Sequence, residues 1–310
     1  MTMMLTLPCE ILEKIVLASG SLEDAYRAAV ILNLDISSKI KQILEQDVDQ
    51  LSRDGNVKLL RWWKSSGLTL QWSEWSMDYA SENGHVAVLD WWLKSGLELR
   101  WSYRAMDWAS VRGHVAVLEW WKSSGLPFEW SVNAINLASE NGHVAVLEWW
   151  KSSGLQLKWS ERAIDLASEN GHVAVLEWWK SSGFLLEWSD DDAMDWASRN
   201  GHIAVLDWWK SSGFQLEWSE YAMDWASQNG QITVLDWWKS SGLQLKWSES
   251  AMDWASRNEH VAVLEWWKSS RLECRWSDRA MDWASVRGHV AVLDWWLNSG
   301  LECKWSKRSI

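Results

Sequence analysis

The sequence predicts an all-α solenoid of about nine helix–turn–helix repeats joined by short extended connectors. Three observations lead to this fold class. A pair of tryptophans returns about every 29 residues, glycine is almost confined to two positions in each repeat, and apolar residues between the glycines follow helical spacing. A chain of 310 residues is too long for one ordinary compact core, but a repeat array avoids that limit because its neighbours cover each unit.

The tryptophan pairs set the period of the array. Successive pairs lie 29 residues apart except for one step of 30, whose extra residue falls in the run Asp190-Asp191-Asp192. The pairs are Trp62-Trp63, Trp91-Trp92, Trp120-Trp121, Trp149-Trp150, Trp178-Trp179, Trp208-Trp209, Trp237-Trp238, Trp266-Trp267 and Trp295-Trp296.

The first helix of a repeat can be read in the unit that begins at Ser160. Serine is a favourable N-cap, and an acidic residue follows it in the first turn, where the helix dipole favours negative charge. Ala163, Ile164 and Ala167 then form the stripe of a helix packed on one side. Gly171 ends this helix, since glycine readily adopts the left-handed conformation of a C-cap.

The second helix of the same unit carries Val173, Leu176 and the tryptophan pair, and ends at Gly183. A short extended connector with alternating apolar residues follows and reaches Trp188, after which Ser189 caps the next unit. Each repeat is therefore predicted to be a helix, a tight turn, a second helix and an extended connector.

This repeat resembles the ankyrin repeat. The segment A-I-D-L-A-S-E-N-G-H-V-A-V-L-E-W-W-K-S-S-G, Ala163 to Gly183, shares with that family Ala167, Gly171, His172, the apolar second helix and its closing glycine. The family tetrapeptide T-P-L-H is replaced by A-I/M-D, the paired leucines are replaced by Trp-Trp, and the unit is roughly four residues shorter than the usual 33. The resemblance implies an ankyrin-type α-solenoid that binds other proteins, with the first helices along its concave face.

The resemblance spans residues 47–305, so we expect a repeat array over 47–310 with a degenerate first unit and an incomplete last helix. Residues 1–46 are not a repeat and are expected to form a helical N-terminal segment. Their opening resembles an F-box, a motif that binds a Skp1-like adaptor; the alternative is a small helical cap on the first repeat. The residues that carry the F-box resemblance, and would bind the adaptor, are Leu7, Pro8, Ile11, Leu12 and Ile15.

Charge and composition exclude several classes of partner. The formal net charge is −12 and no Lys/Arg cluster stands against it, which is the wrong sign for binding nucleic acid. No apolar run is long enough to span a membrane, and Glu10 and Glu13 interrupt the apolar stretch near the N-terminus, so neither a membrane segment nor a secretory signal is predicted. Three cysteines without disulfide or zinc spacing suit a reducing compartment, so we expect a cytoplasmic or nuclear protein.

Repeated polar residues are interpreted as structural, not catalytic. Equivalent side chains of stacked helices lie about 8–10 Å apart, too far to share one zinc ion, and a site copied in every repeat is the opposite of a unique catalytic pocket. We therefore predict no enzyme activity, no cofactor and no metal. The repeated aspartates, with Asn136 at one position, are expected to form a hydrogen-bonded ladder. The histidines, which the resemblance places at structural hydrogen bonds in the turns, are His85, His114, His143, His172, His202, His260 and His289.

The 33 tryptophans are the unusual part of the composition. The pairs are expected to fill the core, because each indole buries on the order of 150–250 Å². The tryptophan of each connector allows a second interpretation, a row of exposed rings that holds a peptide or a glycan. These connector positions are Trp72, Trp101, Trp130, Trp159, Trp188, Trp218, Trp247, Trp276 and Trp305.

The predicted function is a non-catalytic scaffold that binds another protein on the concave face. The two residues after each capping serine vary from repeat to repeat, while the Lys-Ser-Ser stretch closing the second helix scarcely changes. Trp, Tyr and Arg are the residues that tend to dominate binding energy. The alternatives are an F-box-type substrate receptor of a ubiquitin ligase and the tryptophan-row binder. The expected contact residues are Trp75, Tyr103, Arg104, Asn133, Arg162, Asp191, Tyr221 and Arg279.

Overall fold

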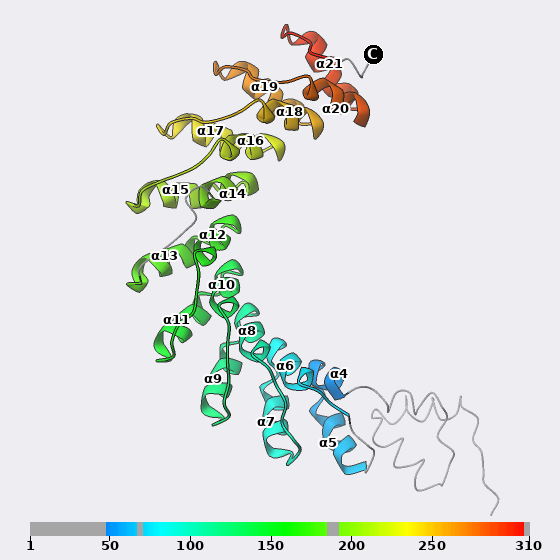
Figure 1. Ribbon diagram of the computed structural model, residues 1–310, viewed down its shortest axis with the longest axis vertical. Helices are drawn as coiled ribbons and strands as arrows, with labels where there is room; N and C mark the ends of the chain where they lie inside the picture. Colours follow the sequence, from blue (N-terminus) through cyan, green and yellow to red (C-terminus); the bar gives the residue numbers. More distant parts are fainter. Residues whose placement is uncertain (1–47, 67–70, 185–191, 307–310) are drawn as a thin grey trace, which may run out of the picture. The chain divides into compact units, whose positions relative to one another are not determined.

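The computed structural model describes residues 48–66, 71–184 and 192–306. Within these ranges the chain forms eighteen α-helices and no strand, arranged as consecutive pairs (Figure 1). The predicted fold class, an α-solenoid of helix–turn–helix repeats, is confirmed. The F-box-like residues 7–15 and Asp191 lie outside the described residues, and the domain boundary predicted at residue 46 remains a prediction.

Each repeat contributes a first helix and a second helix. The first helices are α4 (Val48–Arg53), α6 (Trp75–Glu82), α8 (Arg104–Val111), α10 (Asn133–Glu140), α12 (Arg162–Glu169), α14 (Asp192–Asn200), α16 (Tyr221–Gln228), α18 (Ser250–Arg257) and α20 (Arg279–Arg287). The second helices are α5 (Val57–Ser66), α7 (Val86–Lys94), α9 (Val115–Ser123), α11 (Val144–Ser152), α13 (Val173–Ser182), α15 (Ile203–Ser212), α17 (Ile232–Ser240), α19 (Val261–Ser269) and α21 (Val290–Asn298).

The helix ends follow the predicted caps. Gly113, between α8 and α9, has φ +79°, and the amide of His114 donates to the carbonyl of Ala109 at 2.8 Å, the closing bond of a Schellman turn. At the other end, Ser102 Oγ accepts from the amide of Arg104 at 3.2 Å. The serine therefore caps as predicted, although the first helix begins one residue later than the sequence suggested, a difference typical of helix ends.

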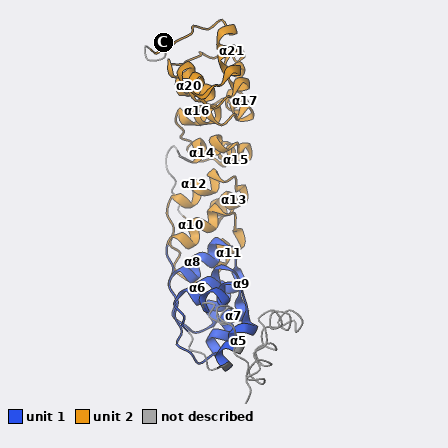
Figure 2. Cartoon of the chain, turned by 90° about the vertical axis from the view of Figure 1, so that its right-hand side faces the viewer, with its two compact units in different colours: residues 1–131 blue, residues 132–310 orange. Residues whose placement is uncertain are grey.

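The chain divides into two compact units, residues 1–131 and 132–310 (Figure 2). Within each unit, neighbouring first helices pack extensively against one another, whereas neighbouring second helices meet at few points. The hydrophobic core lies between a layer of first helices and a layer of second helices. Ala105 and Met106 of a first helix, and Val117, Leu118 and Trp121 of a second, are each at most 1% exposed. The hydrophobic effect therefore holds every helix by one face against its own pair and the adjacent pairs.

The connectors have the extended character that was predicted. Exposure alternates residue by residue from Gly125 to Trp130, the period expected of an extended chain with one side on the protein. The single 30-residue step leaves the stacking register intact, because Trp208 and Trp209 bond the same types of partner as their equivalents, at separations of 31 and 41 residues instead of 30 and 40.

Candidate protein-binding face

Most of the paired tryptophans that the structure describes are buried in the core, as predicted, and most of their indole N–H groups have hydrogen-bond acceptors. The two rings of a pair meet edge to face with centroids 5.0–5.1 Å apart. The second tryptophan donates Nε1–H, at 2.9–3.1 Å, to a serine hydroxyl in the first helix of the preceding repeat. These bonds join Trp92 to Ser52, Trp121 to Ser81, Trp179 to Ser139, Trp209 to Ser168, Trp238 to Ser198, Trp267 to Ser227 and Trp296 to Ser256.

The first tryptophan of a pair finds a carboxylate instead. Its Nε1–H donates, at 2.7–2.9 Å, to the acidic residue that precedes the tryptophan pair of the preceding repeat. The bonds run from Trp120 to Asp90, Trp178 to Glu148, Trp208 to Glu177, Trp237 to Asp207, Trp266 to Asp236 and Trp295 to Glu265. Six pairs thus make two bonds to the preceding repeat, one to each of its helices.

The connector tryptophans are also structural in large part. Most are half-buried, each packing its ring on a paired tryptophan, as Trp247 does on Trp267 with centroids 5.7 Å apart. Five of their indole N–H groups donate to the carbonyl 26 residues further along, in the next connector. These bonds, 3.0–3.1 Å long, join Trp72 to Glu98, Trp101 to Pro127, Trp218 to Gln244, Trp247 to Glu273 and Trp276 to Glu302.

A fourth class of aromatic residue lies on the outer side of the first helices. We call this surface the first-helix face, and its central positions are Tyr79, Trp108, Leu137, Leu166, Trp196, Trp225, Trp254 and Trp283. All are half-buried, between fully buried alanines and aspartates. In the described part of the chain, the indole N–H groups of Trp108, Trp196, Trp225, Trp254 and Trp283 have no hydrogen-bond acceptor. A buried indole N–H usually has a hydrogen-bond acceptor. These five N–H groups are therefore free to donate to an acceptor on a partner protein.

In the first unit this face is a compact aromatic cluster. Trp75 stacks on Tyr79 with centroids 5.2 Å apart and on Trp108 at 5.6 Å. The guanidinium of Arg104 lies 4.9 Å from the Trp75 centroid, and that of Arg53 lies 5.1 Å from Tyr79. Stacked rings capped by guanidinium groups form a flat, rigid surface with cationic edges.

In the second unit the face begins with the aliphatic Leu137 and Leu166 and continues as tryptophan. Trp196 and Trp225 have centroids 4.7 Å apart, and Arg199 lies over both, at 4.7 and 5.6 Å. Arginine also covers Trp283. The face therefore changes from aliphatic to aromatic along one unit, which gives different positions different chemistry.

The predicted contact residues border this face. Trp75 and Arg104 are brought together, and Tyr103, 45% exposed, lies beside Arg104. Tyr221, also 45% exposed, stacks on Trp225 at 4.9 Å, and Arg279 lies 5.8 Å from Trp283. Asn133 and Arg162 are exposed at the first positions of α10 and α12.

The sequence interpretation missed the central residues of the first-helix face. They stand four positions after the variable residues, the spacing at which side chains on a helix meet. Trp75 and Tyr79, Arg104 and Trp108, and Tyr221 and Trp225 are such pairs. The spacing of four residues could have predicted these positions, because it places the ring and the variable residue on the same side of the helix.

The repeated aspartates form the predicted ladder, with Asn136 as one member. Eight members accept the amide of the next capping serine, 24 residues on, at 2.9–3.3 Å. The serine–acceptor pairs are Ser73–Asp49, Ser102–Asp78, Ser131–Asp107, Ser160–Asn136, Ser219–Asp195, Ser248–Asp224, Ser277–Asp253 and Ser306–Asp282. In six of the aspartate pairs the serine hydroxyl donates as well.

Burial shifts the pKa of three aspartates of this ladder. It raises the pKa of Asp78, Asp224 and Asp253, and the serine donors oppose the rise. For Asp224, which is 0% exposed, the pKa rises to about 6. The carboxylates join consecutive repeats and lie beneath the first-helix face, so they position it and do not form part of its surface.

The histidines bridge consecutive turns. Nε2 of His85 and of His289 bonds the carbonyls of Arg53 and Arg257, respectively, at 3.0 Å, and burial lowers the pKa of His202. The structural role predicted for this position is therefore confirmed at these residues. No group of three or more His, Cys, Asp or Glu side chains in the described ranges is arranged to hold a metal ion. Cys274 and Cys303 are free thiols.

No protein-family model and no curated protein sequence matches the chain. Among solved structures it is similar to the crystal structure of the human ASB11 ankyrin repeat domain, with 14% sequence identity and a TM-score of 0.48, over 61% of this chain and 96% of that domain. No helix of the described segments has the length and apolar character needed to cross a bilayer.

Proposed function

We propose that the protein is a non-catalytic interaction scaffold that binds another protein on the first-helix face. The observation that carries this proposal is the difference between classes of tryptophan. Most paired and connector indoles donate to acceptors within the stack, whereas the five tryptophans of the first-helix face lie half-buried with no acceptor for their N–H groups among the described residues. Rigid aromatic rings beside arginine are the usual composition of binding hot spots.

The packing of the helices supports the choice of face. Neighbouring first helices pack closely within each unit, as expected for the concave side of a solenoid, and the variable residues predicted from sequence border the same surface. The connector row is a weaker candidate for a peptide or glycan site, because its N–H groups and one face of its rings are occupied internally. The F-box-type receptor remains a prediction from the sequence of residues 7–15.

A leucine substitution tests this face with little risk to the fold. Leu137 and Leu166 occupy the same position in two repeats, so Trp108→Leu and Trp225→Leu replace a ring by a side chain that the helix already accepts. Proteins that co-purify with the wild-type chain would be identified by mass spectrometry, and their affinities for each variant measured. We expect losses of about tenfold or more for each variant, the scale of a hot-spot residue.

The three bordering residues are tested in the same assay. Trp75→Ala, Tyr103→Ala and Tyr221→Ala should each weaken binding by about 1 kcal/mol or more while helicity stays unchanged. Trp159→Phe, which keeps an aromatic ring in a connector, is the control and should bind normally. Normal binding by all five first-helix variants, together with loss of binding in the folded connector variant, would transfer the function to the connectors.

A further inference from the structure

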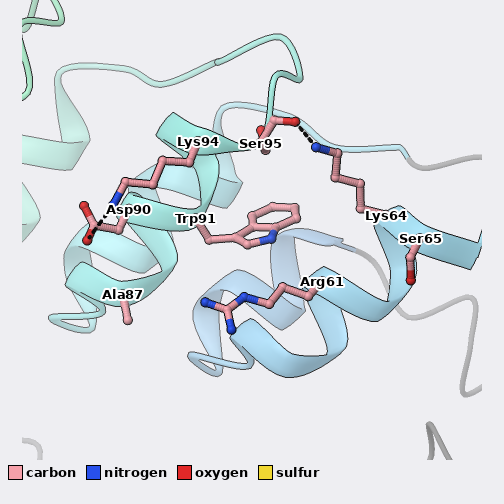
Figure 3. A pocket seen from close by; sticks show the side chains of 8 residues that line it. All are labelled: Arg61, Lys64, Ser65, Ala87, Asp90, Trp91, Lys94 and Ser95. Carbon is pink, nitrogen blue, oxygen red and sulfur yellow. Dashed lines mark hydrogen bonds and ion pairs between the residues drawn. The ribbon is translucent and has the colours of Figure 1, made fainter.

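One pocket lies at the start of the array, between α5 and α7, on the side away from the first-helix face. It has a volume of about 550 Å³ and is lined by Arg61, Lys64, Ser65, Ala87, Asp90, Trp91, Lys94 and Ser95 (Figure 3). Three of these eight residues are basic, in a chain whose net charge is −12.

The pocket lies where the repeat pattern is broken twice. The residue before the tryptophan pair is Asp or Glu in every other repeat but is Arg61 here. The position of Lys94 holds serine in every other repeat except the last, which has Asn298. Arg61 replaces an acidic residue by a cation, Lys94 is the usual lysine moved by one position because Leu93 stands in its place, and both cations line the same pocket.

The consequence for Trp91 is the loss of its acceptor. In later repeats the equivalent indole N–H donates to the carboxylate that Arg61 replaces, as Trp120 donates to Asp90 at 2.9 Å. Trp91 Nε1 has no hydrogen-bond acceptor among the described residues. Figure 3 shows its indole nitrogen on the side of the ring that faces Arg61 across the pocket. The guanidinium of Arg61 likewise has no partner in the described residues.

The remaining charged groups are already engaged. Asp90 accepts from Trp120 through one oxygen and pairs with Lys94 through the other at 3.6 Å, while Lys64 donates to the carbonyl of Ser95. A guanidinium and an indole N–H are therefore left pointing at a space from which a carboxylate has been removed. Arginine binds carboxylates in a bidentate manner, and the same indole donor binds them in six other repeats.

We propose that this pocket binds a carboxylate side chain of an acidic peptide segment, which replaces the carboxylate missing from the α5–α7 interface. Arg61 and Trp91 hold the two oxygens, and Lys64 and Lys94 add long-range attraction. The proposal is independent of the first-helix face, since no residue is shared between the two surfaces.

Calorimetric titration of the full chain with an end-blocked hexaglutamate peptide at low ionic strength tests the assignment. Arg61→Glu should reduce the affinity by about tenfold or more, the scale of a charge-assisted hydrogen-bond pair, and Lys64→Ala should reduce it several-fold. Two controls match these changes in net charge. Lys151→Ala removes the equivalent lysine of another repeat, and Arg162→Glu reverses a charge on the first-helix face; both should bind as the wild type does.

A second measurement separates a binding role from a folding defect. Arg61→Glu restores the repeat pattern and gives Trp91 an acceptor, so its unfolding midpoint should rise by about 2 °C, whereas a damaged fold would lower it. The proposal is overturned if the wild type does not bind the peptide, if Arg162→Glu weakens binding as much as Arg61→Glu, or if the midpoint of Arg61→Glu falls. Inorganic phosphate that binds more tightly than the peptide would overturn the carboxylate assignment in favour of a phosphate.

Discussion

The two helix layers of this protein use the same residue for different purposes. In the second-helix layer, neighbouring helices meet at few points, and tryptophan pairs fill the space between them with their indole donors bonded across the interface. In the first-helix layer the backbones pack closely through alanine and the aspartate–serine ladder, so tryptophan is not needed as a filler and lies at the surface. The comparison teaches that the role of a tryptophan here depends on whether its N–H has an acceptor in the adjacent repeat.

The largest expected effect comes from removing a filler of the second layer. Trp267→Ala deletes a side chain that is 0% exposed, leaves a cavity and removes the indole donor of the Ser227 hydroxyl. We expect a loss of about 3–5 kcal/mol in the free energy of unfolding, measured by urea denaturation. Trp254→Leu, in the first-helix layer of the same repeat, should cost less than about 1 kcal/mol. Equal losses in the two variants would erase the distinction between the layers.

The ladder of the first layer makes the stability depend on pH. The pKa of Asp224 is about 6 in the folded protein, above the ordinary 3.8, so folding favours its protonated form. This contribution to stability is complete below pH 3.8 and is lost as pH rises through 6, a change of about 3 kcal/mol by linkage.

The substitution that tests this dependence already occurs in the chain. Asn136 occupies the ladder position of another repeat, with its amide oxygen accepting from the Ser160 amide and its nitrogen donating to the Ser160 hydroxyl. Asp224→Asn should therefore fold normally, and its free energy of unfolding should no longer show the change between pH 4 and pH 6.5 that Asp224 causes. Denaturation curves at several pH values would detect the difference. A pH profile that superimposes on the wild-type profile would show that this carboxyl does not titrate in that interval.

The smallest effect concerns the repeat that lacks both glycine caps. Glu259 and Arg271 have φ of +64° and +65°, the left-handed region that other repeats fill with glycine. Glu259 ends the first helix and Arg271 ends the second, so each layer carries one strained turn. A left-handed residue with a side chain costs about 1 kcal/mol.

Replacing both residues with glycine tests this strain, and each change should recover about 1 kcal/mol. Glu259→Gly should recover less of this, because Glu259 also pairs with His289 at 3.4 Å. Amide hydrogen exchange in α18 and α19 should slow in the double variant. If exchange there already equals that of α16 and α17 in the wild type, this repeat is not the weak point of the array.

Much of the fold followed from the sequence because its signals are local. Glycine caps, capping serines and apolar spacing lie within one repeat, and the spacing of Asp224 and Ser248 made a ladder between repeats foreseeable. The acceptors of the indole groups were not foreseeable, because the 40-residue separation of Trp267 from Ser227 becomes a contact only after the repeats are stacked in register. The first-helix face was missed for a related reason. A tryptophan that lies between buried residues in the sequence looks like core, and only packing shows that it stays half-exposed.

The bonds between repeats also have a direction, and that direction bears on how the array can change in length. For the aspartate–serine ladder, the paired tryptophans and the turn histidines, the later repeat supplies the donor and the earlier repeat supplies the acceptor. Within these three networks a repeat presents acceptors to the repeat that follows and donors to the repeat before it, while the connector indoles donate in the other direction. Removing or duplicating a whole unit that carries the shared residues keeps these bonds in register, whereas a shift by a few residues breaks all of them at once. Such an array gains and loses recognition surface in whole modules, each carrying one central side chain of the first-helix face.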